Sequence, residues 1–424
     1  MKLPSSLIVL VLALAAPALG ATELALDPPA TGDLVPGTLR PAPSAIPRTL
    51  SVAPSAIPAQ PQPTTVEHRP VQVDWALNPR VPLQTTPQTF VPRSREYWMD
   101  VTQSELQRGV PLPVSAPGAV IRLNPAAGRY GALRPAQVSL QVGARTLNAA
   151  GPGVATADTR ALAAAGISAP PGSVMLHLDP TLGSTTPTLR APAAHGRYVV
   201  HVFEPQSHTE LSARLAQGNV LAGQAQTVRL NLDAAGTIAP IGSVGGFVMA
   251  PDGQTRTLHF THEADGSVRA TVPTGFTDTT GGALWEVHSF TSSVIRGRTV
   301  LRDVTTVFAS AVPNARLAGD ADVQHDARGG LDVRFGVLAE NASRYALGAT
   351  LWATGADGRL HPIGYAQSAD WLDAGHGALV LHFDAAVVRR AGFGPPYALR
   401  DLRLQDQATM SLLERRADAL TFAF

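Results

Sequence analysis

The sequence contains no cysteine, and lysine occurs only at Lys2. The missing cysteines exclude a disulfide scaffold, a thiolate metal site, a thiol nucleophile and acylation at a lipoprotein-type cysteine. Charged residues make up 15% of the chain, compared with about 25% in an average globular protein. The 33 basic and 32 acidic side chains nearly cancel. No net charge therefore draws the chain to nucleic acid or to an anionic membrane, and we predict no nucleic-acid partner.

Long apolar runs are also scarce, and the longest lies at the N-terminus. Residues 7–16 (LIVLVLALAA) follow Lys2 and have the length of a signal-peptide core. Residues 18–20 (ALG) fit the small-x-small rule for cleavage. A membrane-spanning helix needs about 20 apolar residues. We therefore predict a signal peptide over residues 1–20, a mature chain exported to the periplasm or the extracellular medium, and no transmembrane segment in that chain.

Proline is abundant over residues 21–93, and the segment APSAIP occurs at 42–47 and again at 53–58. Proline fixes φ and has no N–H group, so it disfavours helices and central strands. We predict a proline-rich linker that is largely disordered or extended. Residues 71–75 and 81–83 are candidates for short edge strands within it.

Beyond the linker, apolar and polar residues alternate in many short runs, which is typical of β-strands. Clear examples are residues 138–142, 174–178, 228–232 and 331–337. Asp-Gly pairs at 252–253, 265–266 and 357–358 predict hairpins, because this pair accepts the positive φ of tight turns. We predict an all-β fold of tandem β-sandwich domains. They are a β-rich N-terminal domain (94–207), an immunoglobulin-like sandwich (208–317) and a β-rich C-terminal domain (318–424).

Few segments favour a helix. Residues 97–109 (YWMDVTQSELQRG) predict a short helical turn closed by glycine. Over residues 158–166, Asp158 can cap the start of an alanine-rich helix and Gly166 can end it. Residues 384–391 and 409–416 are further candidates for short helices.

No catalytic motif is complete. A nucleophile elbow requires Gly-x-Ser-x-Gly, and residues 241–245 (IGSVG) lack the first glycine in register. A zincin requires His-Glu-x-x-His, and His262-Glu263 is followed by a turn without a second histidine. We predict a protein without enzymatic activity and without a cofactor. A secreted hydrolase whose site forms only in the fold stays open as an alternative.

Three aspartates, Asp320, Asp322 and Asp326, lie between the second and third blocks of strands. Calcium often stiffens junctions between tandem sandwiches by binding carboxylates there. The spacing lacks the pattern of a hand-type calcium loop. A calcium site and a solvated polar linker are therefore both open interpretations.

Histidine occurs in two settings. His177, His259, His288 and His382 alternate with apolar residues, which predicts positions on the outer faces of strands. Two such histidines on neighbouring strands can bind a metal, and the alternative is that they are polar residues on a solvated face. The group 201–208, with His201, Glu204 and His208, lies where the first block joins the second. It predicts either a ligand cluster or a hydrogen-bonded domain junction.

Aromatic residues are few, with five tryptophans in the whole chain. Flat rings can stack on the apolar faces of sugars. The candidates for ligand contact are Tyr97, Trp98, Trp352 and Trp371, with Trp285 as a further aromatic residue. The alternative is that these rings anchor the cores of the domains.

Several stretches taken together carry a resemblance to a known family. They are residues 97–110 and 116–122, the hairpin at 251–253, and residues 371–375, 396–402 and 413–416. The pattern resembles an uncharacterised family of exported bacterial proteins, classed as a domain of unknown function. The resemblance implies tandem immunoglobulin-like sandwiches, and its motifs carry no catalytic assignment that could be transferred to this chain. We predict an exported, non-enzymatic binding or adhesion protein for an unknown protein or glycan. The alternatives are a secreted hydrolase and a structural accessory of the cell envelope.

Overall fold

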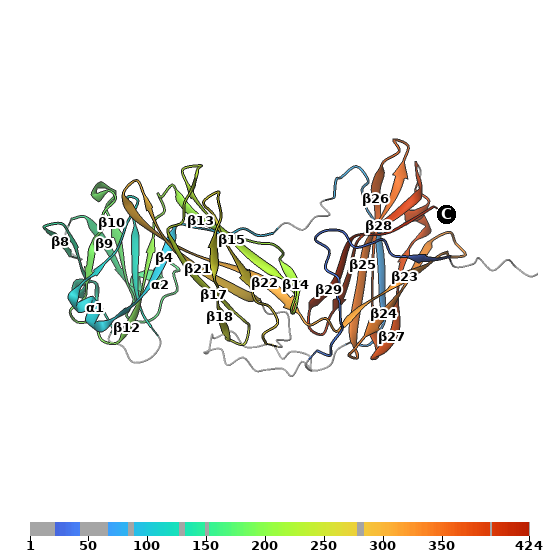
Figure 1. Cartoon of the computed structure of the whole chain (residues 1–424), viewed down its shortest axis with the longest axis horizontal. Coiled ribbons are helices and arrows are strands. Elements are labelled where there is room, and N and C mark those ends of the chain that lie inside the picture. Colours follow the sequence, from blue (N-terminus) through green and yellow to red (C-terminus); the bar gives the residue numbers. More distant parts are fainter. Residues whose placement is uncertain are drawn as a thin grey trace, which may run out of the picture. The chain divides into compact units, whose positions relative to one another are not determined.

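The alternating sequence forms antiparallel strands along nearly the whole chain (Figure 1). The structure is a computed structural model, and it describes residues 22–42, 67–83, 89–126, 132–148, 152–277, 284–390 and 392–423. The predicted signal peptide and the second APSAIP segment lie outside these residues. No helix within the described ranges is both long enough and apolar enough to cross a membrane.

The chain divides into two units. Among the residues that the structure describes, the central unit lies within 89–312 and also includes Ala42. The C-terminal unit combines residues 313–423 with the N-terminal stretches 22–41 and 67–83.

The first sandwich of the central unit has two sheets that share one apolar core. One sheet has the order β4 (Glu96–Thr102), β12 (Arg197–Phe203), β6 (Val120–Pro125), β10 (Val174–Leu178) and β9 (Val154–Asp158). The other has the order β5 (Val110–Pro111), β11 (Thr188–Arg190), β7 (Ser139–Val142) and β8 (Arg145–Asn148). Val174, Leu176 and Leu178 are buried and His177 is exposed, so the alternation predicted for this strand is confirmed.

The second sandwich follows in the same unit. One sheet has the order β19 (Phe260–His262), β20 (Val268–Val272), β15 (Gln226–Ala234), β13 (Thr209–Leu215) and β3 (Arg93–Ser94), and β16 (Ile238–Ala239) pairs with β15. The other has the order β14 (Asn219–Leu221), β22 (Arg298–Ala311), β21 (Trp285–Ile295), β17 (Ser243–Met249) and β18 (Thr255–Thr257). Trp285 and Phe308 are buried in the core between these sheets, which makes Trp285 a core anchor.

The C-terminal unit also contains two sheets. Their orders are β1 (Thr22–Ala25), β23 (Ala315–His325), β24 (Leu331–Ala339) and β27 (Gly375–Phe383), and β2 (Val71–Ala76), β26 (Leu360–Leu372), β25 (Ser343–Gly355), β28 (Phe393–Asp406) and β29 (Ser411–Phe422). The blue N-terminal strands therefore lie among orange and red strands in Figure 1. Together these sheets and those of the central unit confirm the all-β, tandem-sandwich prediction.

The proline-rich segment differs in part from the predicted linker. Its pieces TELA and VQVDWA lack proline and pair with β23 and β26, and β3 at its end pairs with β13. Open sheet edges offer unpaired N–H and C=O groups to any extended, proline-free segment. Residues 71–75 thus form the edge strand for which they were a candidate, whereas residues 81–83 are not part of a strand.

Helices are short. Two of the predicted starts are confirmed: Asp158 caps α2 (Thr159–Ala164) and Asp384 caps α3 (Ala385–Val388), each by accepting a backbone N–H. At 97–109 only the second half is helical, as α1 (Gln103–Arg108), with a capping box between Thr102 and Glu105. The helix predicted at 409–416 is wrong, because this segment lies largely in β29 and pairs with β28. The 3₁₀ turns are η1 (Pro135–Gln137) and η2 (Pro180–Leu182).

Candidate functional site

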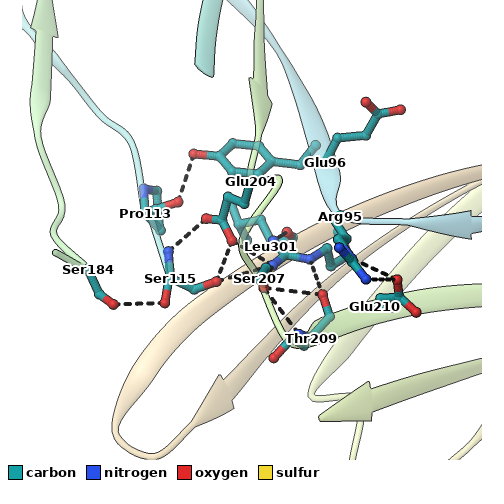
Figure 2. Close-up of polar contacts among 12 residues, drawn as sticks. Arg95, Glu96, Pro113, Ser115, Ser184, Glu204, Ser207, Thr209, Glu210 and Leu301 are labelled. Atoms are coloured by element: carbon teal, nitrogen blue, oxygen red, sulfur yellow. Dashed lines mark hydrogen bonds and ion pairs between the residues drawn. The ribbon is translucent and has the colours of Figure 1, made fainter. Parts of the chain in front are cut away.

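A buried ion pair holds the two sandwiches of the central unit together (Figure 2). Glu204 follows β12 at the end of the first sandwich, and Arg302 lies on β22 of the second. Both side chains are 0% exposed, and Arg302 Nη2 lies 2.6 Å from Glu204 Oε2. Ser115, from the first sandwich, donates its backbone N–H to Glu204 Oε1 at 2.7 Å.

Each nitrogen of the Arg302 guanidinium group donates at least one hydrogen bond. Nη2 donates to Ser207 Oγ at 2.7 Å, Nε to the Thr209 carbonyl at 3.0 Å, and Nη1 to its neighbour, the Leu301 carbonyl, at 2.7 Å. A buried charge is tolerated when it is paired and its hydrogen-bonding groups are occupied. The prediction of a hydrogen-bonded junction at 201–208 is therefore confirmed for Glu204, whereas His208 is exposed.

Beside this junction the central unit contains a pocket of about 490 Å³, which we call the Trp98 pocket. Its wall comes from β4 of the first sandwich and from β17, β21 and β22 of the second. Its lining includes Trp98, Ser243, Gly245, Phe290, Ser292 and Asp303. The pocket is thus formed by strands that lie far apart in the sequence.

The register of the second sandwich sets one wall of the pocket. Gly245 pairs with Phe290, and Phe290 pairs with Asp303, so these residues form one row across β17, β21 and β22. A Cβ atom added to Gly245 would lie 2.3 Å from Phe290 Cε2. The absence of a side chain at Gly245 therefore makes room for the Phe290 ring, which stays 49% exposed.

The Trp98 ring is held in a fixed orientation. It stacks on the His201 ring, with centroids 3.8 Å apart and planes inclined by 10°. His201 Nε2 in turn lies 2.8 Å from Glu96 Oε2, and this hydrogen bond lowers the pKa of Glu96. Trp98 remains 45% exposed. The pocket thus offers a large aromatic surface that is ordered before any ligand arrives.

Asp303 supplies the carboxylate of the pocket. Its Oδ2 accepts the backbone N–H of Trp98 at 2.8 Å, which links the two sandwiches a second time. Burial raises the pKa of Asp303 from 3.8 to about 6, because a low-dielectric surrounding disfavours the charged form. The hydroxyl groups of Ser243 and Ser292 add polar groups to the same lining.

The other aromatic candidates have different surroundings. Tyr97 is 1% exposed and donates its hydroxyl to the Pro113 carbonyl at 3.0 Å. Trp352 is 9% exposed and lies under the Arg400 guanidinium at 5.1 Å. Trp371 stacks on His68 with centroids 3.9 Å apart. Of the four predicted ligand-binding residues, Trp98 is the one whose ring is both exposed and placed in the pocket.

Phe290 and Asp303 were missed at the sequence level. A signal for Phe290 was present, because it alternates with buried residues on β21 and so is the one aromatic side chain on an outward face that also carries Glu286, His288, Ser292 and Val294. Nothing near Asp303 in the sequence marks it, since its surroundings come from β4.

The three aspartates considered for calcium do not form a cluster. Asp320 and Asp322 lie on β23 opposite Ala25 and Glu23 of β1. Asp326 Oδ1 accepts the backbone N–H groups of Arg328 and Gly330 in a turn. Across the part of the chain that the structure describes, no group of three carboxylate or imidazole side chains is arranged to hold a metal ion. Calcium binding stays a prediction.

His177, His288 and His382 lie on strands and alternate with buried residues as predicted, whereas His259 lies between β18 and β19 and is not part of a strand. Two of the outward histidines have acidic partners. His288 Nε2 lies 2.8 Å from Glu286 Oε2, and His382 Nδ1 lies 2.7 Å from Asp332 Oδ1. These pairs occupy an imidazole nitrogen that a metal ion would use.

Comparison with known proteins identifies a family. The model described as "Domain of unknown function (DUF4785) N-terminal domain" matches residues 62–204, and the corresponding C-terminal domain model matches residues 314–423. The crystal structure of a DUF4785 family protein from Legionella pneumophila is similar, with a TM-score of 0.65 and 20% identity over 84% of this chain and 93% of that chain.

Two matches with adhesion proteins have low TM-scores. A tetra-tandem repeat from the extending region of a large adhesion protein has a TM-score of 0.17 and 12% identity, over 69% of this chain and 68% of that chain. An Escherichia coli adhesin has a TM-score of 0.19 and 15% identity, over 79% and 98%. Scores this low carry no argument about function. No curated protein matches the chain. The two family models together cover more than half of the sequence, and the chain belongs to the DUF4785 family of proteins of unknown function.

Proposed function

We propose that this protein is an exported, non-enzymatic binding protein and that the Trp98 pocket binds a glycan. The observation that carries the proposal is the combination of two exposed aromatic rings, Trp98 and Phe290, with the carboxylate of Asp303 in one cavity. The export part rests on the apolar N-terminal segment of the sequence.

A sugar fits the chemistry of this lining. A pyranose has apolar C–H faces and a rim of hydroxyl groups, so it needs flat aromatic surface together with a few polar partners. Ligand sites in general combine apolar walls with a small number of placed polar groups. Trp98 and Phe290 supply the rings, and Asp303, Ser243 and Ser292 supply the polar groups.

The order of the Trp98 ring favours binding as well. A side chain that must be immobilised on binding costs about 0.5–1.5 kcal/mol. The His201 stack and the Glu96 contact already fix Trp98. This part of the ordering cost therefore does not reduce the affinity for a ligand.

The carboxylate content of the pocket supports binding over hydrolysis. Glycoside hydrolysis generally uses two carboxyl groups about 5–10 Å apart. The described lining contains one carboxylate, Asp303, and this carboxylate already accepts the Trp98 N–H.

The test is a binding assay with Trp98→Ala. Short cello-, chito- and malto-oligosaccharides are titrated into the purified mature chain and followed by calorimetry. We expect one class to bind, and Trp98→Ala to weaken that binding by about tenfold or more, because a lost aromatic contact of about 1.4 kcal/mol corresponds to tenfold. Phe290→Ala should act in the same direction.

Trp75→Ala is the matched control, because Trp75 is 48% exposed but belongs to the C-terminal unit. It should leave binding unchanged. The proposal is wrong if Trp98→Ala and Trp75→Ala bind equally well, or if none of these oligosaccharides binds to the folded wild-type chain.

A further inference from the structure

The strand β2 is an open sheet edge. It is the terminal strand of its sheet, and among the described residues no strand pairs with its far side. Its outward side chains Val71, Val73 and Trp75 are 46%, 45% and 48% exposed. Natural edge strands are usually protected by lysine, a bulge or an inward-pointing charge against pairing with another chain. β2 has no lysine or arginine and no bulge in its register with β26, and its one charged side chain, Asp74, accepts the Asp384 N–H inside the unit.

The backbone groups that face outward can be assigned from the ladder. The Leu77 N–H donates to the Ile363 carbonyl at 2.9 Å, just beyond the last pair of β2 with β26. In an antiparallel pair, residues alternate between those that hydrogen-bond to the partner strand and those that do not. Val71, Val73 and Trp75 therefore direct their backbone groups to β26, whereas Gln72 and Asp74 direct theirs to the free edge.

This edge is complementary to itself. If two copies of β2 lie antiparallel about a two-fold axis through Val73, Gln72 of one copy lies opposite Asp74 of the other. These are the residues with outward backbone groups, so each pair can exchange both hydrogen bonds. On the outer face, Val71 then lies opposite Trp75, and Val73 lies opposite the second Val73. Every apolar side chain of the strand gains an apolar partner.

The side chains of Gln72 and Asp74 are already engaged inside the unit, so they leave this edge clear. Gln72 Nε2 donates to the Val380 carbonyl of β27 at 3.0 Å, and Asp74 Oδ2 accepts the Asp384 N–H at 2.9 Å. Pro70 and Pro79 flank the strand, and proline cannot extend a ladder because it has no N–H. Pairing is thereby limited to one short segment with one register.

We propose that the protein forms a two-fold dimer in which β2 of one copy pairs antiparallel with β2 of a second copy about Val73. The occupant is a second copy because the edge matches itself in both hydrogen bonding and side chains. One strand pair buries less surface than the roughly 1,200 Å² of a stable interface, so the dimer is weak and reversible. This inference concerns the C-terminal unit and does not depend on the Trp98 pocket.

The absence of cysteine from the chain allows a test with single-cysteine variants. At the two-fold axis the two Val73 Cα atoms lie about 4.5 Å apart, as in any pair without hydrogen bonds, and this falls within the range of disulfides. We expect Val73→Cys to form a covalent dimer under mild oxidation. Val71→Cys should stay monomeric, because its partner position is Trp75 in the other copy. The double variant Val71→Cys/Trp75→Cys should cross-link again.

Two further measurements guard against chance cross-linking and misfolding. Met410→Cys is a matched control in the same unit, since Met410 is 79% exposed but lies in a turn, and it should not cross-link. In sedimentation at high concentration, the wild-type mass should approach that of a dimer, and Val73→Lys should remain a monomer with an unchanged circular dichroism spectrum. The proposal is overturned if Val73→Cys cross-links no faster than Met410→Cys, or if Val73→Lys associates like the wild type.

Discussion

The central and C-terminal units hold their parts together in different ways. In the central unit, the buried contacts between the two sandwiches are made by side chains, namely the Glu204–Arg302 ion pair and the hydrogen bond from the Trp98 N–H to the Asp303 carboxylate, and the backbone adds only the two-residue strand β3 on β13. In the C-terminal unit, backbone hydrogen bonds attach the N-terminal residues to the sheets: β1 pairs with β23, β2 pairs with β26, and Leu34 exchanges backbone hydrogen bonds with Arg415 of β29. A side-chain connection depends on a few atoms, whereas a strand ladder depends on many. Single substitutions should therefore affect the two units very differently.

The largest effect is expected for Glu204→Gln. The variant keeps the shape of the side chain but leaves the Arg302 guanidinium buried without a counter-charge. Breaking a buried pair by removing one partner typically costs about 3–5 kcal/mol. We expect a loss of this size in the free energy of unfolding of the central unit, measured by urea denaturation.

Its control is Asp100→Asn. Asp100 lies 3.5 Å from Arg197, and the two side chains are 69% and 66% exposed, so this variant should cost below about 1 kcal/mol. The double variant Glu204→Gln/Arg302→Met removes both charges and should recover part of the lost stability. Equal losses for Glu204→Gln and Asp100→Asn would show that the buried pair does not hold the junction.

The second-largest loss of stability is expected in the C-terminal unit. Leu34 is 4% exposed, and its N–H and carbonyl pair with Arg415 at 3.0 Å and 2.7 Å. Leu34→Ala keeps this backbone bridge and removes the buried side chain, which typically costs about 2–5 kcal/mol. We expect the lower half of this range, because the neighbouring ladder pairs remain and no buried charge is exposed.

The matched control for Leu34→Ala is Val81→Ala in the same N-terminal segment, where the side chain is 51% exposed. It should change the unfolding midpoint little. A loss of unfolding free energy for Leu34→Ala as large as that for Glu204→Gln would contradict the proposed difference between the two units. The N-terminal segment would then depend on one side chain as strongly as the junction does.

The sequence predicted those features whose cause is local. Alternation predicted the strands, and the capping carboxylate of Asp158 predicted the start of α2. The segment 409–416 has residues that favour a helix, yet pairing with β28 makes most of it a strand. Ladder formation with a neighbouring strand therefore overrides local propensity here.

The composition of the Trp98 pocket also depends on strand pairing and not on local sequence. Trp98 was among the predicted aromatic residues, but its partners Phe290 and Asp303 come from strands of another sandwich. Only the register that aligns Gly245, Phe290 and Asp303 brings them into one row. Residues 71–75 were a candidate edge strand and form β2, whereas the strand β1 was not predicted, because backbone pairing leaves little mark on side-chain composition.

The smallest expected effect is a pH dependence of stability in the central unit, and it comes from Asp303. The pKa of Asp303 is about 6 in the fold and 3.8 as the ordinary value. Between these values the folded state binds more protons than the unfolded state, so stability from this group falls as pH rises from about 4 to about 6 and stays constant above. Asp303→Asn cannot ionise, and its amide oxygen can still accept the Trp98 N–H. Between pH 4 and pH 7, the free energy of unfolding of Asp303→Asn should therefore rise by about 1–2 kcal/mol relative to that of the wild type, since one pKa unit corresponds to 1.36 kcal/mol before screening. Urea denaturation at both pH values measures this. Identical pH profiles for the two proteins would show that the Asp303 carboxyl is solvated in the folded chain, and the comparison would then depend on the buried Glu204–Arg302 ion pair without support from Asp303.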